Sequence, residues 1–228
     1  MTLNAHTIMD MSNIMGKKVF VAGDSFSYGS ELSDIHNVWW RNVWPNAYSI
    51  TMPGASNDYI LRNLRYFLNT QRHQQSSVDF VAIMWTFPTR FEFCFDKDID
   101  TGRFSQWHTI GTKKEPEEIQ HFTHTFNKYV GTNILHQQHN AWMNISYAEM
   151  LLQKYEIDYM FTHADWDLFG KNGEYTNIDM TRWYMPDPSD KKGFLNWAID
   201  KGYKRGPDGH PLDQAHIDFA KDVYEWLG

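Results

Sequence analysis

Four short apolar runs, separated by segments with helical spacing, limit this chain to few folds. The runs lie at residues 17–23, 48–52, 79–85 and 157–163. Continuous apolar runs of this length, bounded by turn residues, are typical of strands buried on both faces of a parallel sheet. The clearest example is 79–85, which reads Asp-Phe-Val-Ala-Ile-Met-Trp.

Helical patterns fill the gaps between these runs. Apolar residues recur at helical spacing behind Ser56-Asn57-Asp58, which can cap a helix. A longer helical pattern covers 122–155, with a break near Gly131, and a last helix is predicted over about 212–226. This alternation predicts a three-layer α/β/α sandwich with a mainly parallel, flavodoxin-like sheet of about five strands. Ligands are then expected at the carboxyl ends of the strands.

The length of 228 residues predicts a single domain. We expect it to cover residues 15–228 and to follow a flexible arm at 1–14. Two stretches fit the alternation poorly, near 91–118 and 171–192. Loops of this length in a domain commonly form lids or substrate-binding insertions, so both are predicted to be insertions.

Charge and composition narrow the partners that we expect. A net charge of −7 offers no basic surface for a nucleic-acid backbone. The single cysteine, Cys94, cannot form an internal disulfide, which favours a reducing, cytoplasmic location. No run approaches the roughly 20 apolar residues of a membrane span. We therefore expect neither nucleic acid nor a membrane as a partner.

Ser25 stands in the position of a nucleophile. It follows the first apolar run in the sequence Gly23-Asp24-Ser25-Phe26-Ser27 and precedes a predicted helix. Its hydroxyl would lie at the carboxyl edge of the sheet, close to backbone N–H groups. The alternative is that Ser25 caps the helix, a role that Asp24 beside it can also fill.

A serine nucleophile requires a base within hydrogen-bonding distance. His210, in Pro207-Asp208-Gly209-His210-Pro211, has an acidic neighbour and lies just before the last predicted helix. Asp208 can accept the Nδ1 proton of His210 and so fix the tautomer of the ring. The alternative is a turn histidine held by Asp208.

These two blocks resemble those of the SGNH (GDSL-type) hydrolase family. That family has its nucleophile in a Gly-Asp-Ser motif near the N-terminus and an Asp and a His together near the C-terminus. Its last block often continues as His-Pro, a small residue and a second His, and the matching positions here are His210, Pro211, Ala215 and His216. Gly54 is similar to the glycine of the second block, whose N–H helps to form the oxyanion hole. The ordered blocks extend from Phe20 to Ala220.

The sequence departs from the family pattern in two places. The asparagine of the third block is missing after the third apolar run, where Met84-Trp85-Thr86-Phe87-Pro88 stands instead. The resemblance implies that another group supplies this oxyanion donor, and we favour the Asn57 amide over the Thr86 hydroxyl. The family acid lies three residues before its His, whereas Asp208 lies two before His210. The site then uses either Asp208 or a Ser-His dyad.

The resemblance implies a serine esterase or acyl hydrolase that acts through an acyl-Ser25 intermediate. The expected substrate is a small-molecule or saccharide ester, and no cofactor is needed. Further substrate-binding candidates at the predicted strand ends are Asp24, Trp85, Arg90 and Asp165; Arg90 can instead pair with Glu92. Histidine pairs at 121/124 and 136/139 suit a polar helix surface better than a metal site. The rival functions are an O-acyltransferase and a non-catalytic carbohydrate- or protein-binding module.

Overall fold

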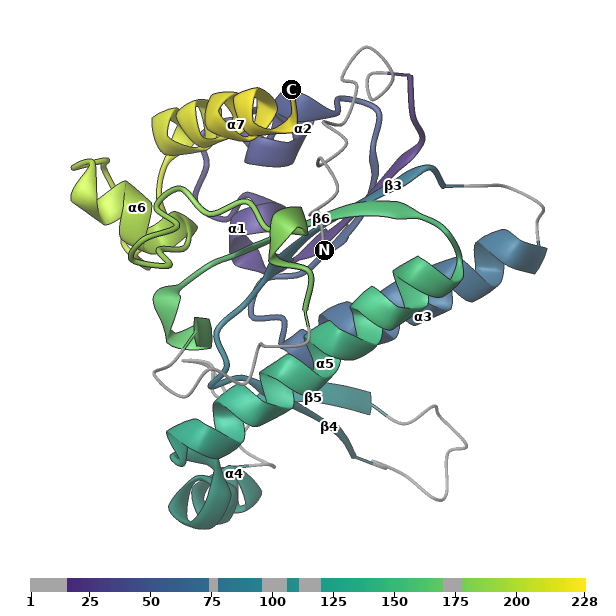
Figure 1. Ribbon diagram of the computed structural model, residues 1–228. Coiled ribbons are helices and arrows are strands. Elements are labelled where there is room, and N and C mark those ends of the chain that lie inside the picture. The colour runs from purple at the N-terminus through teal and green to yellow at the C-terminus, as the bar shows by residue number, and fades with distance from the viewer. Residues whose placement is uncertain (1–15, 74–77, 96–105, 111–119, 170–177) are drawn as a thin grey trace, which may run out of the picture.

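A sheet of four parallel strands forms the centre of the molecule, in the order β2-β1-β3-β6 (Figure 1). The structure, a computed structural model, describes residues 16–73, 78–95, 106–110, 120–169 and 178–228. Each strand comes from one of the four apolar runs: β1 (Val19–Gly23), β2 (Tyr48–Thr51), β3 (Phe80–Trp85) and β6 (Asp158–His163). The central strands β1 and β3 are buried along their whole length. The predicted parallel sheet and the positions of its strands are confirmed.

The described residues hold four strands in this sheet where about five were expected. Beyond β6, Trp183 makes a single parallel bridge to Phe161, and the N–H of Tyr184 donates to the Phe161 carbonyl at 2.8 Å. Pro186 and Pro188 follow at once and have no N–H to donate. A fifth strand is therefore reduced to one bridge.

Helices cover both faces of the sheet (Figure 1). One face carries α1 (Ser25–Tyr28), α2 (Trp39–Val43), α6 (Phe194–Asp200) and α7 (Asp213–Leu227). The other face carries α3 (Asn57–His73) and α5 (Ile134–Lys154). Successive β1 side chains alternate between two cores, so Val21 packs under α2 and α7 and Ala22 under α3 and α5. The three-layer α/β/α architecture is confirmed.

The long helical pattern at 122–155 forms two helices. In the first, α4 (Gln120–Phe126) runs into a π-helical turn, η4 (Asn127–Gly131). Gly131 suits this end because a Cβ atom there would collide with the side chain of Asn127. Next, Asn133 caps α5 by accepting the N–H groups of the first helical residues. The predicted break near Gly131 is confirmed. In the described part of the chain, no helix is long and apolar enough to span a membrane.

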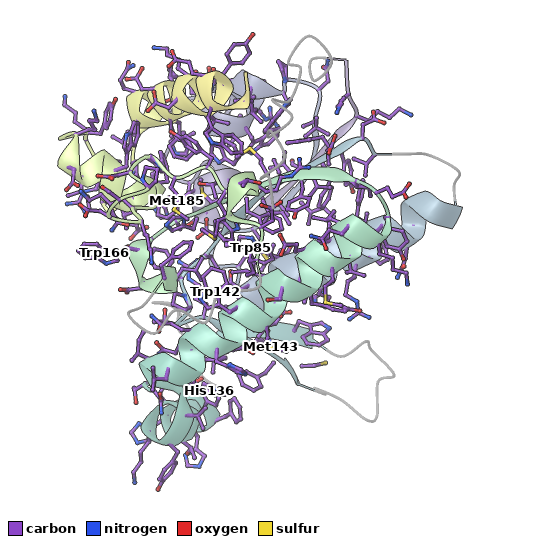
Figure 2. All side chains as sticks on the ribbon, in the orientation of Figure 1. Trp85, His136, Trp142, Met143, Trp166 and Met185 are labelled. Carbon is purple, nitrogen blue, oxygen red and sulfur yellow. The ribbon has the colours of Figure 1, made fainter. Side chains whose placement is uncertain are left out.

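Part of the first poorly fitting stretch, 91–118, forms an antiparallel hairpin of β4 (Phe91–Phe95) and β5 (Gln106–Ile110). The alternation Phe-Glu-Phe-Cys-Phe in β4 is typical of a strand with one covered face. Figure 2 shows His136 of α5 beside this hairpin, where its ring stacks on Phe91 at 5.8 Å. The predicted arm at 1–14 and much of both predicted insertions (96–105, 111–118 and 171–177) lie outside the described residues.

Candidate active site

Ser25 lies at the carboxyl end of β1, in the first position of α1. Asp24, not Ser25, is the N-cap: its Oδ1 accepts the N–H of Phe26 at 3.0 Å. The preceding residue is Gly23 because a Cβ atom there would collide with the Ser27 side chain. Ser25 is 3 % exposed, and neither its Oγ nor its N–H is hydrogen-bonded to any residue that the structure describes. Its side chain is therefore not used to cap the helix.

Gly54 lies beside this serine in the loop that follows β2. The loop is placed by parallel pairing of β2 with β1, in which Thr51 lies opposite Gly23, and by a bond from the Met52 N–H to the Gly23 carbonyl at 3.3 Å. Gly54 has φ 76°, in the left-handed region that favours glycine. Among the described residues, its N–H has no hydrogen-bond acceptor. Two unused N–H groups, of Ser25 and Gly54, thus stand on neighbouring strand ends.

A buried polar cluster underlies these two loops. Arg90 Nη1 lies within hydrogen-bonding distance of three acceptors, with Asp24 Oδ2 at 3.0 Å, the Ala55 carbonyl at 3.2 Å and Thr86 Oγ1 at 2.8 Å, and its two N–H groups are shared among them. The Thr86 hydroxyl donates to Asp24 Oδ2 at 2.6 Å. Asp24 is fully buried and Arg90 lies with its guanidinium on the Phe87 ring. Arg90 therefore connects the loops that carry Ser25 and Gly54.

This cluster changes several sequence-based assignments. The single hydroxyl proton of Thr86 is used by Asp24, so it is not available to an oxyanion. Asp24 and Arg90 neutralise each other below the site, which leaves them no free charge for a substrate. Arg90 does not pair with Glu92 either: Glu92 accepts two hydrogen bonds from Arg62, at 3.0 and 2.7 Å.

Asn57, the first residue of α3, makes two hydrogen bonds to the backbone of Thr86. Its Nδ2 donates to the Thr86 carbonyl at 3.2 Å, and its Oδ1 accepts the Thr86 N–H at 2.9 Å. The residue is 1 % exposed. An amide carries two N–H groups, so one donor on Asn57 is unused among the described residues.

Glu31, rather than Asp208, contacts the candidate base. Glu31 Oε2 lies 2.6 Å from His210 Nδ1 and accepts the His210 N–H at 3.1 Å, while Oε1 accepts the Asp208 N–H at 2.9 Å. Gly206 allows this approach because a Cβ atom there would collide with the Glu31 carboxylate. The prediction that the Asp208 carboxylate orients His210 is therefore wrong. Asp208 contributes its backbone, since the tight turn at Gly209 (φ 92°) points its N–H at Glu31.

The electrostatics of this pair favour an ionised Glu31. Partial burial raises the pKa of Glu31, but hydrogen bonds from the Asp208 N–H and from His210 outweigh it and leave the pKa below its usual value. Glu31 also has φ 65°, an unfavourable backbone conformation for a residue with a side chain, and such strain is common at functional sites. With Nδ1 against a carboxylate, the lone pair of the neutral ring lies on Nε2.

His210 packs against Phe26, the residue after Ser25, and is not hydrogen-bonded to Ser25 itself. The His210 ring packs edge-on against Phe26, the neighbour of Ser25, with centroids 5.3 Å apart. No hydrogen bond joins Ser25 Oγ to His210, and Nε2 has no partner among the described residues. The His210 side chain is 19 % exposed, so water and substrate can approach the ring.

The loop that carries Glu31 is fastened to α7 by Asp213. The Asp213 carboxylate accepts the N–H groups of Ser33 and Asp34, both at 3.1 Å, and Asn37 Nδ2 at 3.0 Å. Partial burial raises the pKa of Asp213, but these hydrogen bonds lower it more, so its pKa lies well below the usual range. The turn η2 (Ile35–Asn37) is thereby held against the start of α7.

Other candidates at the strand ends serve the core. Trp85 lies in the interior of the molecule (Figure 2) and is fully buried. It packs edge-on against Phe161, so it is not a substrate contact. Asp165 accepts the Asp167 N–H at 3.0 Å and Asn196 Nδ2 at 3.3 Å, which links the turn η5 (Trp166–Phe169) to α6. His216, the second His of the last block, is fully buried; its Nδ1 accepts the Trp39 N–H at 3.3 Å, and burial lowers its pKa to about 3.

The sequence analysis did not identify Glu31 as the partner of His210, or Arg90 as the residue that joins the Ser25 and Gly54 loops. Glu31 is 179 residues from His210 along the chain, and no local spacing indicates the contact. A weak signal was present for Arg90, because a cation just after β3 lies at the same sheet edge as Asp24 after β1.

No protein-family model matches this chain, and no curated protein matches its sequence. Among solved structures, it is similar to TesA, at 12% identity over 92% of this chain and 98% of that chain, with a TM-score of 0.48. A lipolytic protein of the G-D-S-L family from Veillonella parvula matches at 13% identity over 91% and 96%, with a TM-score of 0.48. A two-domain esterase active on acetylated mannans matches at 14% identity, with a TM-score of 0.43; the match covers 95% of this chain and 50% of that chain.

Proposed function

We propose that this protein is a serine hydrolase that cleaves carboxylic esters through an acyl-Ser25 intermediate. The observation that carries the proposal is the 2.6 Å contact between Glu31 and His210 Nδ1, which leaves Nε2 as the proton acceptor of a ring that packs on Phe26, the residue after Ser25. The N–H and hydroxyl groups of Ser25 have no partner among the described residues. His210 is the base and Glu31 is the acid that orients it. This assignment gives each of the three residues one role.

In the first half of the reaction, Ser25 Oγ attacks the carbonyl carbon of the ester while His210 Nε2 takes the hydroxyl proton. The carbonyl oxygen becomes an oxyanion that accepts the N–H groups of Ser25 and Gly54 and the unused N–H of Asn57. The tetrahedral intermediate then expels the alcohol, which receives its proton from His210. Water repeats the sequence on the acyl enzyme and releases the acid.

Ser25 and His210 have to approach each other before this first step. Catalytic hydrogen bonds are commonly long without substrate and tighten only when substrate binds. The Ser25 hydroxyl has no competing acceptor among the described residues, so it can turn toward Nε2 without breaking another bond. Proton transfer by a positioned base accelerates such reactions by about 10²–10⁴-fold.

Arg90 is a positioning residue in this mechanism. It touches neither substrate nor reacting atoms, but it binds Asp24, next to Ser25, and the carbonyl of Ala55, next to Gly54. The spacing of the two N–H donors therefore depends on one guanidinium. Oxyanion donors contribute only when they point to where negative charge develops, so this spacing matters to the rate.

The proposal is tested with purified wild type and Ser25→Ala. We expect wild type to hydrolyse p-nitrophenyl acetate and to be labelled by a fluorophosphonate probe, and Ser25→Ala to lose both. Ser33→Ala, which changes an exposed serine on the Glu31 loop, is the matched control and should keep both. Equal labelling of wild type and Ser25→Ala would contradict the proposal, as would no labelling of wild type.

A further inference from the structure

A hollow of about 400 Å³ opens at the edge of the sheet, between α1, α2 and the edge strand β2. Tyr28, Ile35 and Trp40 give it apolar walls, and Ser49 and Thr51 add hydroxyl groups. This volume is in the usual range of small-molecule sites. The hollow therefore has room for a ring or short chain that bears a polar group.

Two of the residues that line the hollow connect it to the loops of Ser25 and Gly54. Tyr28 belongs to the same helix as Ser25, and residues three apart on a helix have Cβ atoms about 5–6 Å apart on one face. Thr51, at the other side of the hollow, pairs with Gly23 in the sheet and lies three residues before Gly54. A substrate whose carbonyl lies between the Ser25 and Gly54 N–H groups can thus extend into the hollow.

Arg41 gives the hollow its charge. It is the only charged side chain among the described residues that line it. Its guanidinium lies over the Trp40 ring, 5.1 Å from the centroid, and Nη1 is 3.3 Å from His36 Nδ1. No carboxylate in the described part of the chain pairs with Arg41, although the whole chain has a net charge of −7. Arg62 and Arg90, by contrast, are each paired with a carboxylate.

We propose that this hollow binds a carboxylate attached to an apolar or aromatic body, so that the preferred substrates are esters carrying such an anion. The proposal rests on the proposed hydrolase function. A guanidinium presents parallel N–H groups that match a carboxylate, and stacking on Trp40 holds it in place. One guanidinium balances a single negative charge, and the ring and aliphatic walls suit the apolar body.

The test compares an anionic acetate ester, 4-acetoxybenzoate, with its neutral methyl ester. Each kcat/KM is divided by the spontaneous hydrolysis rate of the same acetyl group, because the two compounds also differ in electron withdrawal. For wild type we expect kcat/KM to be about tenfold higher for the anion, the effect of one charge-assisted hydrogen bond. Arg41→Met should bring the ratio of kcat/KM values close to one. Arg41→Lys should give an intermediate ratio, because the positive charge is kept and the parallel N–H groups of the guanidinium are lost.

The matched control is Arg65→Met. Arg65 also lacks a carboxylate partner among the described residues, and it lies against Tyr147 at 5.7 Å, on the opposite face of the sheet. It should keep the wild-type ratio.

Binding separates this proposal from the hydrolase assignment. NMR titration measures the affinity of 4-acetamidobenzoate, the amide analogue, for Ser25→Ala and for Ser25→Ala with Arg41→Met. We expect about tenfold weaker binding when Arg41 is lost. If wild type resists the fluorophosphonate probe but binding still depends on Arg41, the hydrolase assignment fails and the anion site stands. A labelled enzyme whose ester ratio is near one, or does not change in Arg41→Met, overturns the anion site.

Discussion

The two halves of the candidate site are built in opposite ways. The half that would hold the oxyanion is buried and closed: Asp24, Thr86 and Arg90 bond to one another, and Asn57 is held by the Thr86 backbone. The half that carries the base, His210 with Glu31, is partly exposed, and Nε2 of its ring has no partner among the described residues. The difference fits two tasks. An oxyanion hole works when its dipoles do not reorganise, whereas a base has to exchange protons with substrate and water.

Activity should fall most when the exposed half of the site is altered. In Glu31→Gln the side-chain amide can donate to Nδ1, which forces the proton of the neutral ring onto Nε2 and removes the acceptor. We expect kcat to fall by about 10⁴-fold, as for the wrong tautomer in a serine protease. Steady-state hydrolysis of p-nitrophenyl acetate measures it.

Asp208→Asn is the matched control for that experiment. It neutralises the acid expected from the sequence but keeps the backbone N–H that Glu31 accepts. We expect its kcat to stay within about twofold of wild type, since Asp208 is an exposed surface residue. A larger loss in Asp208→Asn than in Glu31→Gln would return the orienting role to Asp208.

A smaller loss of activity is expected when the buried half of the site is altered. Arg90→Met leaves the fully buried Asp24 without its cation. We expect the free energy of unfolding to fall by about 3–5 kcal/mol. We also expect kcat to fall by about 10²–10³-fold with little change in KM. The matched control is Arg62→Met, which orphans Glu92, a carboxylate with 2 % side-chain exposure. In Arg62→Met we expect a similar loss in the free energy of unfolding but a loss of less than about tenfold in kcat. Glu92 links the hairpin to α3 and does not position either N–H group of the oxyanion site.

A double variant separates stability from positioning. Asp24→Asn with Arg90→Met removes both buried charges, so we expect the free energy of unfolding to recover while kcat stays low. Added guanidinium ion should restore part of kcat in Arg90→Ala and none in Arg62→Ala. If Arg62→Met and Arg90→Met lose the same fraction of kcat while both stay folded by circular dichroism, Arg90 has no positioning role.

The Asp213 anchor should make a small, pH-dependent contribution to stability. The folded-state pKa of Asp213 is depressed, so its contribution to stability is fully present above the unfolded value of about 3.9 and is lost as pH falls through the folded value. We expect Asp213→Asn to lower the free energy of unfolding by about 1 kcal/mol at pH 7, since the carboxylate is partly exposed. Urea unfolding should show this difference shrinking toward pH 2. A difference that grows at low pH would contradict the anchoring role.

More of the fold than of the candidate site could be predicted from the sequence. The runs that became β1 and β3 are apolar along their whole length, and local pattern is enough to specify strands of that kind. Ser25 and Gly54 could be placed because a strand end determines where the next residue lies. The partner of His210 could not, because Glu31 and His210 are brought together by the packing of the η2 loop on α7, which no local spacing encodes. Similarly, nothing in the sequence around Thr86 indicates that its hydroxyl is used by Asp24.

The contact between Glu31 and His210 also bears on the order of events during synthesis. The strands β1, β2 and β3 can pair once residues up to about 85 have been made, and Ser25 and Gly54 then already lie at one edge. His210 is 179 residues further along the chain than Glu31. Under the proposed function, a nascent chain would carry its nucleophile long before the residue that activates it, and hydrolysis would begin only when α7 docks. Activity in a folding experiment would report that last docking step rather than formation of the sheet.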